Sequence, residues 1–349
     1  MKPKTLLIAG PCSAESREQV MQTAGAMKQA GADMFRAGLW KPRTSPHSFR
    51  GIGETGIAWL AEAQQTFGLP VATEVATPEH LSLCLKAGIR NFWTGARTTA
   101  NPFMVQQLAD ALQALDNETK SSICMMVKNP INPDIDTWCG AIERIRRAGI
   151  SNIVAIHRGF SDSLALTGET MRNDALWSIP LSLHRLMPDI LLVNDPSHLT
   201  GDRQLVGRLS QQALDLGFEG LMIEVHPEPE KALSDAKQQL SIEEAQTLFR
   251  SLVYPSGTDN GGAALSALRR QIDEIDNSIW CLIEERQRVS AEIGELKHKA
   301  GMKIYQEERF REILSARLAW ARLRGISEDA VSRIVNALHE ISINTQLKE

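Results

Sequence analysis

Four side chains that can bind a metal ion stand at similar places in the sequence, each shortly after a short apolar segment. They offer one sulfur, one nitrogen and two carboxylate groups: Cys12, His198, Glu224 and Asp235. Thiolate and imidazole favour the softer divalent ions, so this set suits Mn, Fe, Co or Zn better than Mg or Ca. We therefore expect these residues to hold one divalent metal ion, although Cys12 taken alone could equally be a small buried residue.

Six basic residues occur at comparable places after other apolar segments. They are Arg36, Lys41, Arg43, Arg97, Lys128 and Arg158. Cations gathered at one site repel one another unless an anion binds between them, and guanidinium groups match the oxygens of phosphate and carboxylate in pairs. Any one of them could simply solvate a loop, but together they predict substrates that are phosphorylated, carboxylated or both.

The segments that precede these residues are eight apolar runs, which we expect to be strands. They cover residues 6–9, 34–35, 71–72, 92–93, 123–127, 153–156, 190–193 and 221–223. Apolar residues at helical spacing lie between them, and several of these stretches close on glycine: Gly31, Gly68, Gly88, Gly149 and Gly217. Strand and helix alternating eight times over residues 1–253 predict an α/β fold, the (β/α)8 TIM barrel, whose active site lies at the carboxyl ends of the strands.

A different pattern follows the barrel. Residues 254–263 contain turn-forming residues and almost nothing apolar, which predicts a flexible linker. Residues 264–349 predict three helices, at 264–299, 307–322 and 327–346. At about 1.5 Å per residue the first would extend on the order of 50 Å, too long to be covered by the two shorter helices of the same chain. We therefore predict a small all-α domain that forms an intertwined homodimer, alone or within a larger assembly.

The composition indicates an ordinary globular protein, with 43% hydrophobic and 23% charged residues. The net charge of -4 argues against nucleic acid as a partner. Because no apolar run is long enough for a signal-peptide core or a bilayer span, we expect a cytoplasmic protein without a membrane partner. The five cysteines show no CxxC spacing, and we expect reduced, mostly buried thiols.

The barrel region resembles a known family in a series of motifs. In order along the chain these are GPCS (10–13), FRAGLWKPRTSP (35–46), TEV (73–75), GARTT (95–99), VKN (127–129), HRG (157–159), DPSH (195–198) and EVHPEPEKALSD (224–235). They look like type I 3-deoxy-D-arabino-heptulosonate 7-phosphate (DAHP) synthase, which implies a metal-dependent condensation of phosphoenolpyruvate with erythrose 4-phosphate and release of phosphate. A sister family, 3-deoxy-D-manno-octulosonate 8-phosphate synthase, shares the barrel but lacks KPRT, the motif expected to select the aldose.

This resemblance implies a role for each matching residue. Phosphoenolpyruvate would be bound by Arg36, Lys41, Arg97, Lys128 and Arg158, with Arg36 and Lys41 toward its carboxylate. Erythrose 4-phosphate would be bound by Pro42, Arg43, Thr44 and Ser45. The metal on Cys12, His198, Glu224 and Asp235 would polarise the aldehyde oxygen. Water for the former enol carbon could be delivered by Lys41, which we count as catalytic, by Glu74 or by the metal, and Glu74 could instead pair with a barrel cation.

The helical region resembles a second family. The segments LRRQIDEID (268–276), IEERQRV (283–289), IGELK (293–297), ER (308–309) and SINTQ (342–346) look like the all-helical chorismate mutase domain, an intertwined dimer. Its reaction, chorismate to prephenate, needs only positioning and electrostatics. The resemblance implies that chorismate or prephenate is bound by the partner subunit's Arg269 and by Arg286, Lys297, Arg309, Ser342 and Gln346, with Lys297 and Gln346 catalytic at the ether oxygen.

Two positions depart from the pattern of this second family. Gln306 and Phe310 stand where acids are common, and Phe310 replaces the acid that usually binds the ring hydroxyl. The chain could therefore be a bifunctional enzyme, or a synthase whose helical domain is catalytically weak and serves as a dimerising sensor of chorismate or prephenate. Because the first strand begins only a few residues into the chain, we expect no regulatory extension before the barrel. Allosteric feedback would then come from the helices or from the barrel itself.

Overall fold

The chain divides into two compact units, Met1–Glu274 and Ile275–Glu349. The computed structural model describes residues 5–41, 47–161, 171–254 and 262–347. All strands of the described residues belong to the first unit, and the second consists of helices joined by short turns.

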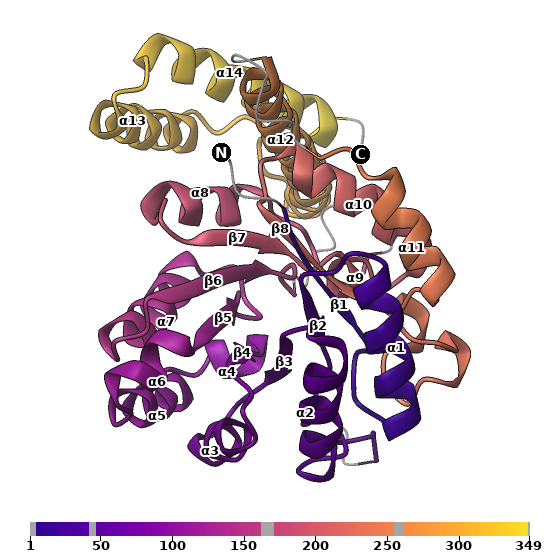
Figure 1. Ribbon diagram of the computed structural model, residues 1–349. Helices are drawn as coiled ribbons and strands as arrows, with labels where there is room; N and C mark the ends of the chain where they lie inside the picture. The colour runs from indigo at the N-terminus through magenta and orange to yellow at the C-terminus, as the bar shows by residue number, and fades with distance from the viewer. Residues whose placement is uncertain (1–4, 42–46, 162–170, 255–261, 348–349) are drawn as a thin grey trace. The chain divides into compact units, whose positions relative to one another are not determined.

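The first unit is a closed barrel of parallel strands (Figure 1). The strands follow one another around the barrel in chain order: β1 (Leu6–Gly10), β2 (Met34–Arg36), β3 (Val71–Glu74), β4 (Asn91–Thr94), β5 (Cys124–Lys128), β6 (Asn152–His157), β7 (Leu191–Asn194) and β8 (Gly220–Glu224). Closure is made by β1 and β8, paired from Leu6 opposite Gly220 to Gly10 opposite Glu224. The predicted (β/α)8 architecture is confirmed, with each predicted strand within one or two residues of the observed one.

Helices connect successive strands and cover the outside of the barrel (Figure 1). They are α1 (Arg17–Gln29), α2 (Thr55–Phe67), α3 (Pro78–Lys86), α4 (Ala96–Thr99), α5 (Pro102–Gln113), α6 (Asn117–Ser122), α7 (Ile135–Arg147), α8 (Ser178–Leu186), α9 (Pro196–Thr200), α10 (Arg203–Asp215) and α11 (Ile242–Ser251), with short 3-10 turns at Pro229–Lys231 and Ala236–Gln238. Side-chain caps start many of them, as where Thr77 accepts from the backbone of His80 at α3. The predicted terminal glycines Gly31, Gly68, Gly88, Gly149 and Gly217 all have positive φ at or just past a helix end.

Alternation along the strands separates two cores. One set of side chains points outward and packs under the helices, and the other fills the barrel interior around Trp93, Met126 and Met222. Because side chains two residues apart share a face, Lys128 follows Met126 and Glu224 follows Met222 on the interior face. The same alternation places Arg36 two residues after Met34. Strand periodicity alone therefore directs three predicted site residues into the carboxyl end of the barrel.

The second unit contains the end of α12 (Gly262–Lys299) together with α13 (Glu307–Arg324) and α14 (Glu328–Gln346). Ser327 caps α14 by accepting from the backbone of Ala330. The three predicted helices are confirmed. Helix α12 begins at Gly262 rather than at residue 264, so the end of the predicted linker 254–263 is helical, and residues 255–261 lie outside the described residues. The domain boundaries stay a prediction.

Two expectations about the whole chain can be compared with the structure. Within the described residues, we find no helix that combines the length and the apolar character needed to cross a bilayer. The five cysteines are free thiols, of which Cys12, Cys84 and Cys124 are buried. Burial raises the pKa of Cys84 and Cys124 to about 12, as expected of inert packing residues.

Candidate active sites

Three of the four predicted metal ligands meet at the carboxyl end of the barrel. The ligand atoms of Cys12, His198 and Asp235 lie within 4.8 Å of one another. Ligands about 2.0–2.3 Å from a shared ion are separated by up to about 4.6 Å, so this spacing is close to that of a loaded site. The fourth, Glu224, lies nearby, with Oε1 3.7 Å from Nε2 of His198. The structure thus brings all four predicted residues to one place.

The protonation states of this group fit a cation. Burial raises the pKa of the Cys12 thiol to about 12, with the charge of Glu224 adding to the effect. Burial lowers the pKa of His198, which keeps its imidazole neutral and able to ligate. Burial alone would raise the pKa of Asp235, but electrostatic interactions with the basic side chains of His198, Arg172 and Lys41 outweigh it and lower that pKa. A neutral imidazole, carboxylates and a thiol that releases its proton to a cation form the donor set of a first-row divalent metal.

Asp195 holds the histidine of this group in place. It follows β7 and caps α9 by accepting from the backbone of His198 at 3.2 Å. Its Oδ2 lies 2.9 Å from Nδ1 of the same ring and 2.7 Å from Nζ of Lys128. A carboxylate on Nδ1 leaves Nε2 as the ligating atom, which is the usual support for a metal-binding histidine. Asp195 therefore couples the predicted metal site to the predicted phosphoenolpyruvate site.

Four of the five predicted phosphoenolpyruvate-binding residues line one small cavity of about 80 Å³. The cavity wall contains Lys41, Glu74, Gly95, Ala96, Arg97, Lys128, Arg158, Arg172, His198 and Asp235. Five cations and two carboxylates face this space. Burial lowers the pKa of Arg158 to about 10, and the charges of Arg172 and Arg97 contribute. Such an excess of positive charge is stable only with an anion between the side chains.

The fifth, Arg36, lies fully buried at the end of β2. Its Nη2 donates to the carbonyl oxygen of Cys12 at 3.2 Å and lies 3.1 Å from Oε1 of Glu224. Its guanidinium carbon lies 4.8 Å from the ring centroid of Trp93, over which the cation can interact with the π system. Among the described residues, its Nε and Nη1 have no hydrogen-bond acceptor. Two buried, unsatisfied donors on a cation indicate a site for an anionic ligand.

The remaining predicted barrel residues have different outcomes. Glu74 is buried, and its Oε2 accepts from the indole nitrogen of Trp93 at 3.1 Å. A Cβ at Gly95 would overlap the carboxylate of Glu74, so a side chain there would displace that carboxylate. Whether Glu74 delivers water or only pairs stays a prediction. The predicted erythrose 4-phosphate residues Pro42, Arg43, Thr44 and Ser45 lie outside the described residues.

The helical unit brings four predicted residues together across two helices. Arg286 of α12 donates through Nη1 to the carbonyl oxygen of Leu338 at 2.8 Å and to the hydroxyl of Ser342 on α14. Lys297 of α12 donates through Nζ to Oε1 of Gln346 at 3.0 Å. These four side chains form two hydrogen-bonded pairs between α12 and α14.

Two other predicted chorismate-binding residues, Arg309 and Arg269, do not belong to these pairs. The side chain of Arg309 is 68% exposed and pairs with Glu312 at 2.9 Å. Arg269 lies on α12 before the second unit begins. Of the two departures from the family pattern, Gln306 is the N-cap of α13, and Phe310 stacks on His339 with ring centroids 4.3 Å apart.

The comparisons with known proteins agree with the barrel geometry. Residues 2–253 match the model of the DAHP synthetase I family. The chain belongs to this family. A phospho-2-dehydro-3-deoxyheptonate aldolase of Thermotoga maritima is 36% identical over 248 residues, which are 71% of this chain and 67% of the relative. The crystal structure of a DAHP synthase from the same organism superposes with a TM-score of 0.62 at 31% identity, covering 71% of this chain and 68% of that one.

Relatives of this DAHP synthetase I chain include the sister family. A 2-dehydro-3-deoxyphosphooctonate aldolase of Variovorax paradoxus is 29% identical over 269 residues, covering 71% of this chain and 88% of the relative. Residues 268–347 match the model of chorismate mutase type II, as the helical motifs predict. The chain therefore carries two regions that each belong to a family of enzymes.

Several residues that contact the predicted ligands were not identified from the sequence. Arg172 lines the cavity of the DAHP synthetase site, and Gln238 and Gln239 lie just beyond the EVHPEPEKALSD motif. Gln239 accepts from the backbone nitrogen of Cys12 at 2.9 Å and donates to the carbonyl oxygen of Ser234 at 2.8 Å. For Gln238 and Gln239, the signal in the sequence was their position three and four residues after the predicted ligand Asp235.

Proposed function

We propose that the barrel condenses phosphoenolpyruvate with erythrose 4-phosphate to give DAHP and inorganic phosphate. The observation that carries this is the small cavity on which the side chains of Lys41, Arg97, Lys128 and Arg158 converge. Phosphoenolpyruvate has a phosphate and a carboxylate close together, and several cations that face one cavity can bind both anionic groups. The name of the Thermotoga maritima relative, a phospho-2-dehydro-3-deoxyheptonate aldolase, supports the same reaction.

A divalent metal on Cys12, His198, Glu224 and Asp235 completes this proposal. When bound, such an ion would act as a Lewis acid on the aldehyde oxygen of the aldose. Lys41 lies at the junction of the two sites, since its Nζ donates to Sγ of Cys12 at 3.0 Å and the side chain also lines the cavity. An ammonium group at this position can hold the carboxylate of phosphoenolpyruvate beside the metal ligands, which orients the nucleophilic carbon toward the aldehyde.

The test of the synthase compares two aldoses with phosphoenolpyruvate in the metal-loaded protein. Phosphate release should depend on erythrose 4-phosphate, and arabinose 5-phosphate should react at least ~100-fold more slowly in kcat/KM. The variant Arg158→Met should raise the KM for phosphoenolpyruvate by roughly 10²-fold through loss of a charged clamp, while the KM for the aldose changes little. Faster turnover of arabinose 5-phosphate would instead assign the reaction of the sister family.

We propose that the helical unit rearranges chorismate to prephenate. The reaction requires no covalent chemistry, so its catalyst must supply cations for two carboxylates and donors for the ether oxygen. Arg286 and Lys297 are such groups, and Ser342 and Gln346 hold them through hydrogen bonds. The match of residues 268–347 to chorismate mutase type II supports this assignment.

A homodimer through the C-terminal helices is part of the same proposal. Apolar residues on the part of α12 within the second unit are exposed at helical spacing: Ile275, Ile279, Leu282, Val289, Ile293 and Leu296. A row of this kind on a single helix is characteristic of a surface covered by a partner. A second copy would cover it and could supply the partner subunit's Arg269 to the site.

The test of the mutase is the disappearance of chorismate with the full-length protein beside Arg286→Ala. Loss of turnover in the variant, by roughly 10²- to 10³-fold, assigns the reaction to this site. The synthase rate of the same preparation is the control. Absence of turnover in both proteins, with the synthase active, would indicate that the helical unit is a dimerising sensor. That is the alternative prediction based on Phe310, which stands where the family usually has an acid.

A further inference from the structure

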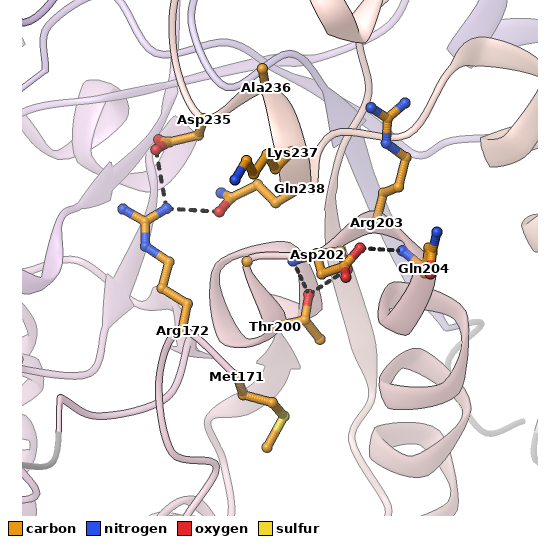
Figure 2. A pocket seen from close by; sticks show the side chains of 11 residues that line it. Met171, Arg172, Thr200, Asp202, Arg203, Gln204, Asp235, Ala236, Lys237 and Gln238 are labelled. Atoms are coloured by element: carbon orange, nitrogen blue, oxygen red, sulfur yellow. Dashed lines mark hydrogen bonds and ion pairs between the residues drawn. The ribbon is translucent and has the colours of Figure 1, made fainter. Parts of the chain in front are cut away.

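A second cavity lies beside the metal-binding residues, on the outer side of one ion pair. It measures about 580 Å³ and is lined by residues from the segments that follow β6, β7 and β8, among them Arg172, Arg203 and Asp235 (Figure 2). Arg172 and Asp235 line this cavity and also the small cavity of the active site. The pair that they form therefore stands between the predicted metal ligands and the outer space.

Arg172 contacts the outer oxygen of Asp235. Its Nη1 donates to Oδ1 at 3.1 Å, whereas Oδ2 of the same carboxylate accepts from Sγ of Cys12 at 3.1 Å. Oδ1 therefore faces Arg172, and Oδ2 faces Cys12 and the predicted metal site. Figure 2 shows the guanidinium group reaching both Asp235 and Gln238.

Gln238 extends the same contact to a second predicted ligand. Its Oε1 accepts from Nη1 of Arg172 at 2.7 Å, and its Nε2 donates to Oε2 of Glu224 at 2.6 Å. The side chain is 1% exposed, so both ends of the amide are used inside the protein. Because an amide has one accepting and one donating end, these two partners fix its orientation. Arg172 and Gln238 together link the carboxylates of Asp235 and Glu224.

The backbone of Asp235 gives an independent reason for such a link. This residue has φ +50° and ψ 39°, the left-handed conformation that residues with a Cβ rarely adopt. Such a conformation persists only where neighbouring contacts hold it. The backbone of Gln238 donates to the carbonyl oxygen of Asp235 at 3.2 Å, and Arg172 holds the side chain.

We propose that Arg172 and Gln238 are positioning residues of the metal centre. They hold the carboxylates of Asp235 and Glu224 from the outer side, so that one oxygen of each faces Cys12 and His198 before an ion arrives. This inference rests on the metal-dependent function proposed above. Substituting a residue that holds a metal ligand typically weakens metal binding by about 10- to 100-fold, and we expect an effect of this size here.

The experiment is a titration of the metal-free full-length protein with Co²⁺. The readout is the thiolate-to-cobalt charge-transfer absorption, which reports ligation by Cys12 directly and requires no turnover. Arg172→Met and Gln238→Met should each weaken Co²⁺ binding by about 10- to 100-fold. The double variant should lose little more than either single one, because both residues act through one network. Arg172→Lys retains a donor and should recover part of the affinity.

Arg203→Met provides the matched control, since Arg203 lines the same outer cavity and pairs with Glu230 instead of a predicted ligand. It should bind Co²⁺ as the unmodified protein does. Wild-type affinity in both Arg172→Met and Gln238→Met, with the band still lost in Cys12→Ala, would overturn the positioning role and leave the metal site standing. The absence of any thiolate band in the unmodified protein would refute the metal site itself. If Gln238→Met does not fold, the half-exposed Arg172 decides the question alone.

Discussion

The barrel site and the helical site differ in how much of each a single chain provides. At the barrel site, Arg36, Asp195 and Glu224 are fully buried, and each contacts another site residue. At the helical site, Arg286 and Lys297 are only partly buried, and Arg309 is 68% exposed. A site preorganised by buried partners can work within one chain, whereas a site open on one side requires something to cover it. The barrel site is thus enclosed within one chain, whereas the proposed helical site would be completed by a second copy.

The largest effect should come from removing the thiol of the barrel site. Cys12→Ala should slow the proposed DAHP formation by about 5 kcal/mol in activation free energy, or several thousandfold, because a ligand of the proposed Lewis-acidic ion is lost. Chorismate turnover should stay within twofold, which a paired assay of both reactions on one preparation can measure. A parallel loss of both activities would show that the two centres do not function separately.

Charged residues in the exposed apolar row of α12 should have the opposite effect, lowering mutase activity and leaving synthase activity largely unchanged. The double variant Ile279→Glu with Val289→Glu should be monomeric by light scattering and should lose roughly 10³-fold in mutase kcat/KM, because a charged group from the partner is removed. DAHP formation should change only severalfold. Asn277→Glu, on the opposite side of the same helix, adds a charge without changing the row and is the matched control. A monomer with full mutase activity would show that the helical site is complete in one chain.

A single donor at the helical site should have a smaller effect than the whole interface. Lys297→Met removes the ammonium that Gln346 holds and should lower the mutase kcat by about 10²-fold, with a smaller change in KM, because the ether oxygen becomes negative only in the transition state. Steady-state kinetics on chorismate measures both values. An increase in KM with kcat unchanged would assign Lys297 to ground-state binding instead.

The smallest effect concerns the stability of the barrel below neutral pH. Burial lowers the pKa of His157 to about 3, and the ring lies between the carbonyl oxygen of Ala175 at 2.7 Å and the amide nitrogen of Asn194 at 3.0 Å. The unfolded chain binds a proton near pH 6.5 and the folded chain does not, so the stability present above pH 6.5 is lost as the pH falls toward 3. The loss should reach up to about 1.4 kcal/mol per pH unit.

His157→Gln removes this titration, so its free energy of unfolding should fall less steeply between pH 6 and pH 5. Chemical denaturation at several pH values, followed by a signal from the barrel, gives the two slopes. Equal slopes in the two proteins would show that another group dominates the acid sensitivity. Unfolding of the helical unit provides an internal comparison, because the hydrogen-bonded side chains of Arg286 and Lys297 are only partly buried.

The sequence predicted the barrel and its charged rim well for a physical reason. Strand alternation and the closing of the barrel decide which side chains point inward, so Arg36, Lys128 and Glu224 could be placed from spacing alone. The contacts between loops could not be predicted in this way. Arg172 and Gln238 meet through the folding of two separate loops, and no periodicity relates them. The partners of Asp195 were missed for the same reason, although its place after β7 was expected.

In the helical unit, the limit of prediction was different. Helical spacing predicted α12, α13 and α14 and the exposure of an apolar row, but spacing does not say how a substitution changes a site. The stacking of Phe310 on His339 is a tertiary contact that fills the place of an expected acid with an aromatic pair.

Gln238 and Gln239 are adjacent in the chain but support different ligands, since one holds the carboxylate of Glu224 and the other the backbone of Cys12. A single insertion or deletion between Asp235 and this pair would shift both glutamines by one position, so that only one of the two places would still hold an amide. The segment should therefore accept changes of residue type far more readily than changes of length. Among descendants of this chain, we expect insertions and deletions to be found in other loops of the barrel rim and to be rare between Asp235 and Gln238.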